Sequence, residues 1–157
     1  ARGRFVKTFH AELFREHGLE TDFAEEYYSV STRRVLRGLH FQLPPHDHNK
    51  IVYCVRGAVL DAVVDLRGDS PSYGQHVILK LDDESCNMVY VPKGCAHGFY
   101  VTSDEAIMVY NVSTVYAPES DTGILWNSAG IPWHDENPIL ADRDCGFKTM
   151  AEFGKVL

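Results

Sequence analysis

Apolar and polar residues alternate over short runs along most of the chain, which is the pattern of half-buried β-strands. Turn-forming sequences separate these runs, namely GDSPSYG at 68–74, DDES at 82–85 and TSDE at 102–105. Many short strands at close spacing indicate a β-sandwich or a closed β-barrel. We expect strands at 26–31, 51–66 with a hinge at Arg56-Gly57, 76–81, 88–91, 98–102 and 106–116.

Helical signals are confined to short segments near the two ends of the chain. Residues 12–18 predict a short helix that ends at Gly18, and another short helix is expected near 149–153. From Pro132 onward the chain is rich in proline, aspartate and asparagine, and we expect this tail to pack across the end of the barrel. Residues 1–157 are therefore expected to form one all-β domain with a few short helices.

Composition narrows the classes of protein without choosing a function. The chain has 157 residues, 45% of them hydrophobic, which is enough to bury a core. A formal net charge of −7 argues against a general nucleic-acid or membrane-surface binder, so neither partner is expected. No apolar run is long enough to cross a bilayer, and the start, ARGRFVKTFH, lacks the apolar core of a signal peptide.

Cysteine usage points to a reducing compartment. No CxxC pairing occurs among Cys54, Cys86, Cys95 and Cys145, so reduced thiols are expected rather than a disulfide framework or a zinc site. We therefore expect a cytoplasmic protein. Because the chain begins inside what looks like a motif, we also expect a preceding segment in the full gene product.

One loop sequence carries a recognisable motif. Pro92, Gly94 and His97 read P-x-G-x-x-H, which resembles the second motif of cupin barrels. Proline and glycine make a tight turn, and His97 begins the next strand, where its side chain can point into the barrel mouth. The resemblance implies a double-stranded β-helix, or jelly-roll, barrel. The alternative is that His97 hydrogen-bonds a neighbour and has no further role.

Metal ligands in a cupin would come from its first motif, for which the candidates here are His46 and His48. The expected glutamate a few residues later is missing, and the cationic Lys50 lies close by instead. Both histidines follow Pro44-Pro45, so we predict solvated loop residues and no metal or other cofactor. A metal-dependent cupin oxygenase that uses His40, His46 or His48, and His97 is the competing hypothesis.

A longer series of motifs resembles the dTDP-4-dehydrorhamnose 3,5-epimerase family. In order they are RGLHFQ at 37–42, PP at 44–45, Lys50, DAVVDLR at 61–67, SPSYG at 70–74, PKGCAHGF at 92–99, YAPE at 116–119, GILWN at 123–127 and LADRD at 140–144. The resemblance implies an isomerase that needs no cofactor, a nucleotide-diphosphate sugar as substrate, and a homodimer with a shared pocket. The reaction implied is inversion at C3, C5 or both of a 4-keto-6-deoxy sugar.

The resemblance also implies roles for four residues. His40 would be the general base, Asp144 would orient it, Lys50 would stabilise an enolate oxygen, and Tyr116 would protonate the opposite face. The chemistry agrees, because histidine titrates near neutral pH, tyrosine is ordinarily protonated there, and a cation answers the charge of an enolate. Lys50 could instead be solvated, and a small shift of the motif would assign Asp142 in place of Asp144.

Further residues are expected to bind the substrate by the same resemblance, namely Arg37, Gln42, His97, Tyr110, Glu119 and Asp121. Tyr110 and Tyr116 lie in a β-rich run, where tyrosines usually pack, so packing is an alternative for both. The residues around Glu119, Asp121 and Asn127 differ from the common family pattern. That difference leaves open whether C3, C5 or both are inverted.

The first motif departs most clearly from the family. Arg2, Arg4 and Lys7 are expected to bind the nucleotide from a segment that crosses to a neighbouring subunit, but Arg4 replaces an aromatic residue and Lys7 an acidic one. We therefore consider a nucleotide other than thymidine diphosphate, or another sugar such as a heptose. The pattern also leaves room for a single-site epimerase, a ketoisomerase or a sugar-binding cupin without catalysis.

Overall fold

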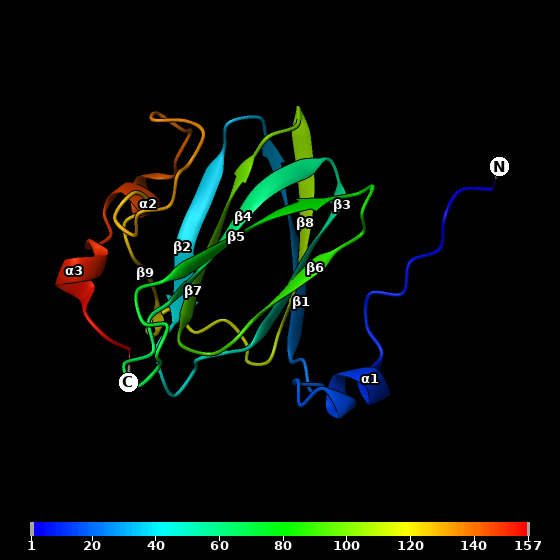
Figure 1. Cartoon of the computed structure of the whole chain (residues 1–157), viewed down its shortest axis with the longest axis horizontal. Coiled ribbons are helices and arrows are strands. Elements are labelled where there is room, and N and C mark those ends of the chain that lie inside the picture. The colour runs from blue at the N-terminus through cyan, green and yellow to red at the C-terminus, as the bar shows by residue number, and fades with distance from the viewer. Residues whose placement is uncertain (1, 157) are drawn as a thin grey trace.

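The computed structural model describes residues 2–156 and contains two antiparallel sheets that face each other (Figure 1). The four-stranded sheet has the order β1 (Glu25–Thr32), β8 (Glu105–Val112), β3 (Lys50–Arg56) and β6 (Met88–Val91). The five-stranded sheet has the order β5 (His76–Asp82), β4 (Ala58–Asp65), β7 (Cys95–Val101), β2 (Leu36–Gln42) and β9 (Asp121–Gly123). The predicted all-β, jelly-roll architecture is confirmed.

Most predicted strands are present, and the predicted hinge separates β3 from β4. Gly57 there has φ of +81°, and a side chain at this position would meet the carbonyl of Glu105. The prediction for 106–116 is wrong at its end, because β8 stops at Val112 and Tyr116 lies in the following connection. Strands β2 and β9 were not predicted.

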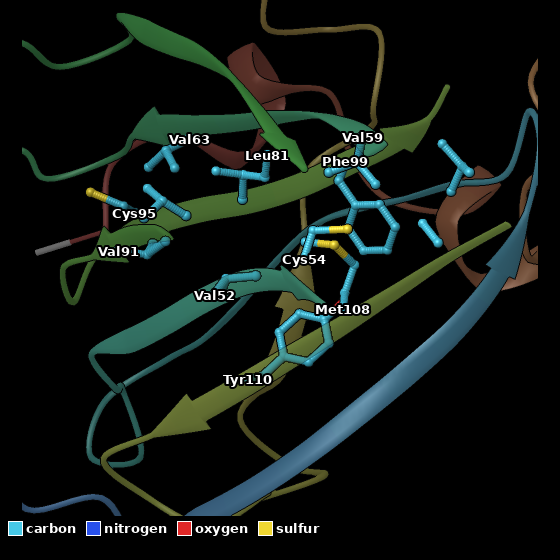
Figure 2. Close-up of a cluster of buried hydrophobic side chains, with 13 residues drawn as sticks. Val52, Cys54, Val59, Val63, Leu81, Val91, Cys95, Phe99, Met108 and Tyr110 are labelled. Atoms are coloured by element: carbon cyan, nitrogen blue, oxygen red, sulfur yellow. The ribbon is translucent and has the colours of Figure 1, made fainter. Parts of the chain in front are cut away.

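Alternation of side chains creates two hydrophobic clusters. Figure 2 shows the first cluster, which lies between the sheets and includes Val52, Met108 and Phe99. The second cluster lies on the outer face of the five-stranded sheet, where Leu39 and Val64 pack beneath the C-terminal part of the chain. The C-terminal tail therefore covers the outer face of the five-stranded sheet, and the expectation that it packs across the end of the barrel is wrong. The reason is that this outer face is apolar, so the tail shields it from water.

The helices are short, as predicted. Helix α1 (Ala11–Glu16) matches the segment predicted at 12–18, and helix α3 (Met150–Phe153) begins at a capping box made by Thr149 and Glu152. Helix α2 (Asp142–Cys145) was not predicted, and it packs beside β2. Within residues 2–156, no helix has the length and apolar character needed to cross a membrane.

Candidate active site

A cavity of about 380 Å³ opens between the two sheets. Its walls are formed by inward-facing side chains of β1, β2, β3, β7 and β8, so it continues the space that the first hydrophobic cluster fills deeper in the barrel. Eight of the residues predicted for the site line it, namely Arg37, His40, Gln42, Lys50, His97, Tyr110, Tyr116 and Asp121. The structure therefore gathers in one place residues that are widely separated in sequence.

His40 is paired with Asp144, as the family resemblance implied. Its Nε2 lies 2.7 Å from Oδ1 of Asp144, which is 2% exposed, whereas Asp142 is exposed to solvent. Burial alone would raise the pKa of Asp144, but hydrogen bonds from His40 and from the Gly38 N–H bring that pKa below its ordinary value. The carboxylate thus orients the imidazole and leaves Nδ1 as the ring nitrogen free to take a proton.

The close approach of β2 to β7 explains why a glycine precedes this histidine in the RGLH sequence. Gly38 has φ of +136°, and a side chain built there would meet the backbone of Gly98 in β7. The Gly38 N–H also donates to Oδ2 of Asp144 at 3.2 Å. Strand β2 is irregular at this point, with a register shift between Arg37 and His40, which is why its sequence lacks a simple alternation.

Lys50 is buried in the wall of the cavity, so the alternative of a solvated lysine is wrong. Its side chain belongs to the inward face of β3, and its Nζ donates to the carbonyl of His40 at 3.4 Å. Burial lowers the pKa of Lys50 to about 8, partly offset by the negative charges of Asp121 and Asp61, with a smaller lowering from Arg143. A buried cation therefore lies beside the His40–Asp144 pair.

A second histidine–carboxylate pair lies deeper in the cavity. Nε2 of His97 is 2.8 Å from Oδ2 of Asp61, and both residues are buried. Burial raises the pKa of Asp61, although His97 and Lys50 oppose that shift. The other oxygen of this carboxylate, Oδ1, has no hydrogen-bond partner among the described residues. Asp61 was missed as a site residue, although an acidic residue at an inward position of the apolar run DAVVDL was an available signal.

The two candidate tyrosines differ in their surroundings. Tyr110 is buried, its ring stacks on Tyr27 with centroids 4.8 Å apart, and its hydroxyl lies 3.1 Å from Oγ of Ser29. Burial raises the pKa of the Tyr110 hydroxyl strongly. Tyr116, by contrast, is 56% exposed at the rim of the cavity and lies outside any strand, so strand packing does not account for it.

Charged residues at the cavity entrance form a mixed group. Arg37 donates from Nε to Oγ of Ser31 at 2.8 Å, and Arg143 forms an ion pair of 2.6 Å with Asp121. Arg143 also lies over the ring of Phe147. Arg143 was not predicted as a site residue, because its position depends on α2 lying beside the cavity. Two arginines in this position can bind a diphosphate.

The two histidines of the 43–49 loop differ, and only His48 departs from the prediction. His48 lines the cavity and is only partly exposed, so the prediction that it is a solvated loop residue is wrong. Burial, together with the positive charges of Lys50 and Lys93, lowers the pKa of His48 to about 3 and keeps this side chain neutral. His46 is partly exposed and lies 2.9 Å from Oγ of Ser120. Over residues 2–156, no group of three or more potential ligands is arranged to hold a metal ion.

Four predicted substrate-binding residues lie away from the cavity within this single chain. Arg2 and Lys7 are exposed in the segment before α1, and Arg4 contacts the carbonyl of Glu84, where it lines a separate hollow of about 270 Å³. Figure 1 shows this segment extending away from the two sheets. Glu119 is exposed, and its Oε1 lies 3.7 Å from Nδ1 of His46. Within one protomer these four residues do not join the site.

Comparison with known proteins agrees with this geometry. Residues 1–152 match the family model described as dTDP-4-dehydrorhamnose 3,5-epimerase. An enzyme of that name from Shigella flexneri is 42% identical over 146 residues, which cover 91% of this chain and 81% of that protein.

Two solved structures have closely similar folds. A 4-keto-6-deoxy sugar epimerase from the novobiocin biosynthetic gene cluster of Streptomyces spheroides has a TM-score of 0.92 and 40% identity, covering 96% of this chain and 77% of that one. A 3'-monoepimerase from Streptomyces bikiniensis, in complex with dTDP-quinovose, has a TM-score of 0.90 and 38% identity, covering 96% and 78%. The chain described here therefore belongs to the dTDP-4-dehydrorhamnose 3,5-epimerase family of isomerases.

Proposed function

We propose that this protein inverts C3, C5 or both of a dTDP-linked 4-keto-6-deoxy sugar by removing a proton next to the ketone. The observation that carries the proposal is the His40–Asp144 pair, with Nε2 and Oδ1 2.7 Å apart, at the wall of a cavity that also holds Lys50 and Tyr116. The dTDP group is proposed because the Streptomyces bikiniensis relative is described with dTDP-quinovose.

His40 is the proposed base. The substrate's C4 ketone acidifies the protons on C3 and C5, and Nδ1 of His40 takes one of them while Asp144 holds the imidazole and stabilises its charged form. Because Asp144 is buried and engages Nε2, the ring cannot turn away from the cavity without losing its hydrogen bond. The electron pair of the broken C–H bond moves toward the ketone and gives an enolate.

Lys50 is the proposed partner of the enolate oxygen. A pKa of about 8 leaves its ammonium mostly protonated at pH 7, and burial strengthens its interaction with a developing negative charge. The proposed acid is Tyr116, which donates its hydroxyl proton to the face of the carbon opposite His40. Its exposure at the rim allows exchange of that proton with solvent. Delivery from the opposite face inverts the carbon.

The test is deuterium incorporation in heavy water, followed by NMR, with dTDP-4-keto-6-deoxyglucose as substrate. We expect deuterium at C3, C5 or both together with an inverted product, and we expect both signals to disappear in His40→Ala. His134→Ala is the matched control, because His134 is an exposed histidine outside the cavity. Absence of exchange in the native protein would contradict the proposal.

The same experiment distinguishes a double epimerase from a single-site one. Exchange with inversion at both carbons identifies a 3,5-epimerase, and inversion at C3 alone identifies a 3-epimerase like the Streptomyces bikiniensis relative. Competition of turnover by dTDP, CDP and GDP then tests the nucleotide. A preference for CDP or GDP would support the hypothesis drawn from Arg4 and Lys7, and a preference for dTDP would reject it.

A homodimer in the cytoplasm is the proposed state of the protein. The outer face of the four-stranded sheet exposes Tyr28, Val30 and Val55, and the segment before α1 exposes Phe5 at 90% of its surface. An apolar sheet face of this kind is typical of an interface. All four cysteines are free, which fits a reducing compartment. Light scattering after size-exclusion chromatography tests the dimer, and Tyr28→Glu should shift it to monomer.

A further inference from the structure

The five-stranded sheet has a position without a side chain directly beside His40. In the ladder between β2 and β9, the Cα atom of His40 is paired with that of Gly123. The aromatic ring of Phe147, from the C-terminal tail, occupies the space above this glycine. A Cβ added to Gly123 would lie 2.6 Å from Cε2 and 2.8 Å from Cδ2 of Phe147, so any other residue at 123 would displace the ring.

The ring of Phe147 also contacts His40. The two ring centroids are 5.8 Å apart, and the planes meet at 72°, which is an edge-to-face arrangement. The His40 side chain is 30% exposed, and Phe147 is itself partly buried. Phe147 therefore borders the imidazole on the side of β9, where it limits both the movement of the ring and the access of water.

The same short segment of the tail thus makes two different contacts with His40. Asp144 accepts a hydrogen bond at Nε2, with 2.7 Å between the two atoms, and three residues later Phe147 packs against the ring. One hydrogen bond fixes one atom of the imidazole but leaves the ring able to tilt about that atom. The packed ring of Phe147 opposes the tilt. It also reduces competition from water, which weakens a hydrogen bond between protein groups.

Phe147 is held in turn by residues at the cavity entrance. The guanidinium of Arg143 lies 5.4 Å from the centroid of the Phe147 ring and is ion-paired with Asp121, at 2.6 Å. Asp121 begins β9, two residues before Gly123. The ring is therefore enclosed by β9, by Arg143 and by His40, and its place does not depend on its own backbone alone.

We infer that Phe147 is a positioning residue for His40, which keeps the imidazole in the orientation set by Asp144 and keeps water from their hydrogen bond. The inference rests on the proposed function, in which His40 removes the proton. Phe147 was not predicted as a site residue, because its contact with His40 depends on how the tail packs on β2 and β9.

The first test is the rate of deuterium uptake by dTDP-4-keto-6-deoxyglucose in heavy water. Uptake requires proton removal by His40, whichever group protonates the opposite face. A misplacement of about 1 Å can slow a catalytic step about 100-fold, and Phe147→Ala leaves the Asp144 hydrogen bond in place. We therefore expect uptake at saturating substrate to fall about tenfold, with KM within about twofold of native. Phe147→Tyr keeps the ring and should stay within about twofold in both.

Phe153→Ala is the matched control. Phe153 lies in the same tail and makes the same kind of edge-to-face contact, at 5.2 Å, with Phe41, the residue after His40 in β2. The substitution removes a comparable apolar contact without touching the imidazole. Thermal melting measures the loss of stability in both variants, and rates are compared per folded enzyme. We expect uptake in Phe153→Ala to stay within about twofold of native.

NMR of protein with 15N-labelled histidine gives a second readout that needs no turnover. Hydrogen bonds keep the pKa of Asp144 below its ordinary value, so its carboxylate accepts from the Nε2–H of His40. Water that reaches this proton exchanges with it and broadens its signal, which His40→Ala identifies by its loss. We expect the signal to be sharp in the native protein and in Phe153→Ala, and broadened in Phe147→Ala.

Three results would overturn the inference: a native rate of uptake in Phe147→Ala, an unchanged Nε2–H signal in that variant, or equal losses in Phe153→Ala. Absence of uptake in the native protein would instead contradict the proposed function. The NMR comparison still decides whether Phe147 protects the His40–Asp144 hydrogen bond in that case, so the two failures are distinguishable.

Discussion

The two sides of the cavity that would handle protons are built differently. On one side, His40 is fixed by Asp144, which is buried and bound also by the Gly38 N–H. On the other side, Tyr116 stands half exposed on a connection, and the described residues hold it by its backbone. In the proposed reaction, the base is therefore held by a buried carboxylate next to a strand, whereas the acid lies on a loop.

The largest effect is expected from Asp144→Asn, which disturbs the carboxylate that holds His40. An amide can hold the imidazole in the wrong tautomer and cannot stabilise its charged form, so deuterium exchange and inversion should both fall about 1000-fold. Asp142→Asn is the matched control, because Asp142 lies in the same helix but is exposed. The measurement is the initial rate of deuterium uptake. A similar loss in both variants would mean that α2 as a whole, and not this carboxylate, supports the base.

Tyr116→Phe changes the proposed acid and leaves the His40–Asp144 pair intact. The hydroxyl is removed and the ring stays, so the ratio of inversion to exchange should fall about 100-fold while exchange itself continues. Tyr100→Phe is the control, because it removes a tyrosine hydroxyl that donates to Asp135 outside the cavity. NMR of the recovered sugar nucleotide measures both quantities. If exchange also stopped in Tyr116→Phe, the claim that proton removal does not depend on Tyr116 would be wrong.

The proposed role of Lys50 concerns both inversion and exchange without inversion, because both would pass through the same enolate. Its pKa of about 8 means that the ammonium is present below pH 8 and is lost above it, so both rates should fall about tenfold per unit well above pH 8. The ratio of inversion to exchange should stay constant through this fall. Lys50→Met should give a low rate that does not fall further above pH 8. A native rate that is flat up to about pH 9.5 would exclude the protonated lysine from the reaction.

The sequence predicted the barrel and most of its strands because alternation and turn residues are local signals. It also predicted the His40–Asp144 pair, but only through resemblance, since nothing local relates residues 104 positions apart. The burial of His48 and the Asp61–His97 pair were not predicted, because each depends on which faces of separate strands meet. For the same reason, the hydrogen bond from the Ala117 N–H to Oε1 of Gln42 could be found only in the fold.

Arg143 belongs with these unpredicted residues, and it provides the prediction with the smallest expected effect. It pairs with Asp121 at the cavity entrance, so Arg143→Ala should weaken binding of the diphosphate and raise KM about fivefold. Exchange and inversion at saturating substrate should both stay near native, with their ratio unchanged. Arg33→Ala is the control, because it removes an exposed ion pair elsewhere. A changed ratio would show that substrate placement, as well as Tyr116, decides which face is protonated.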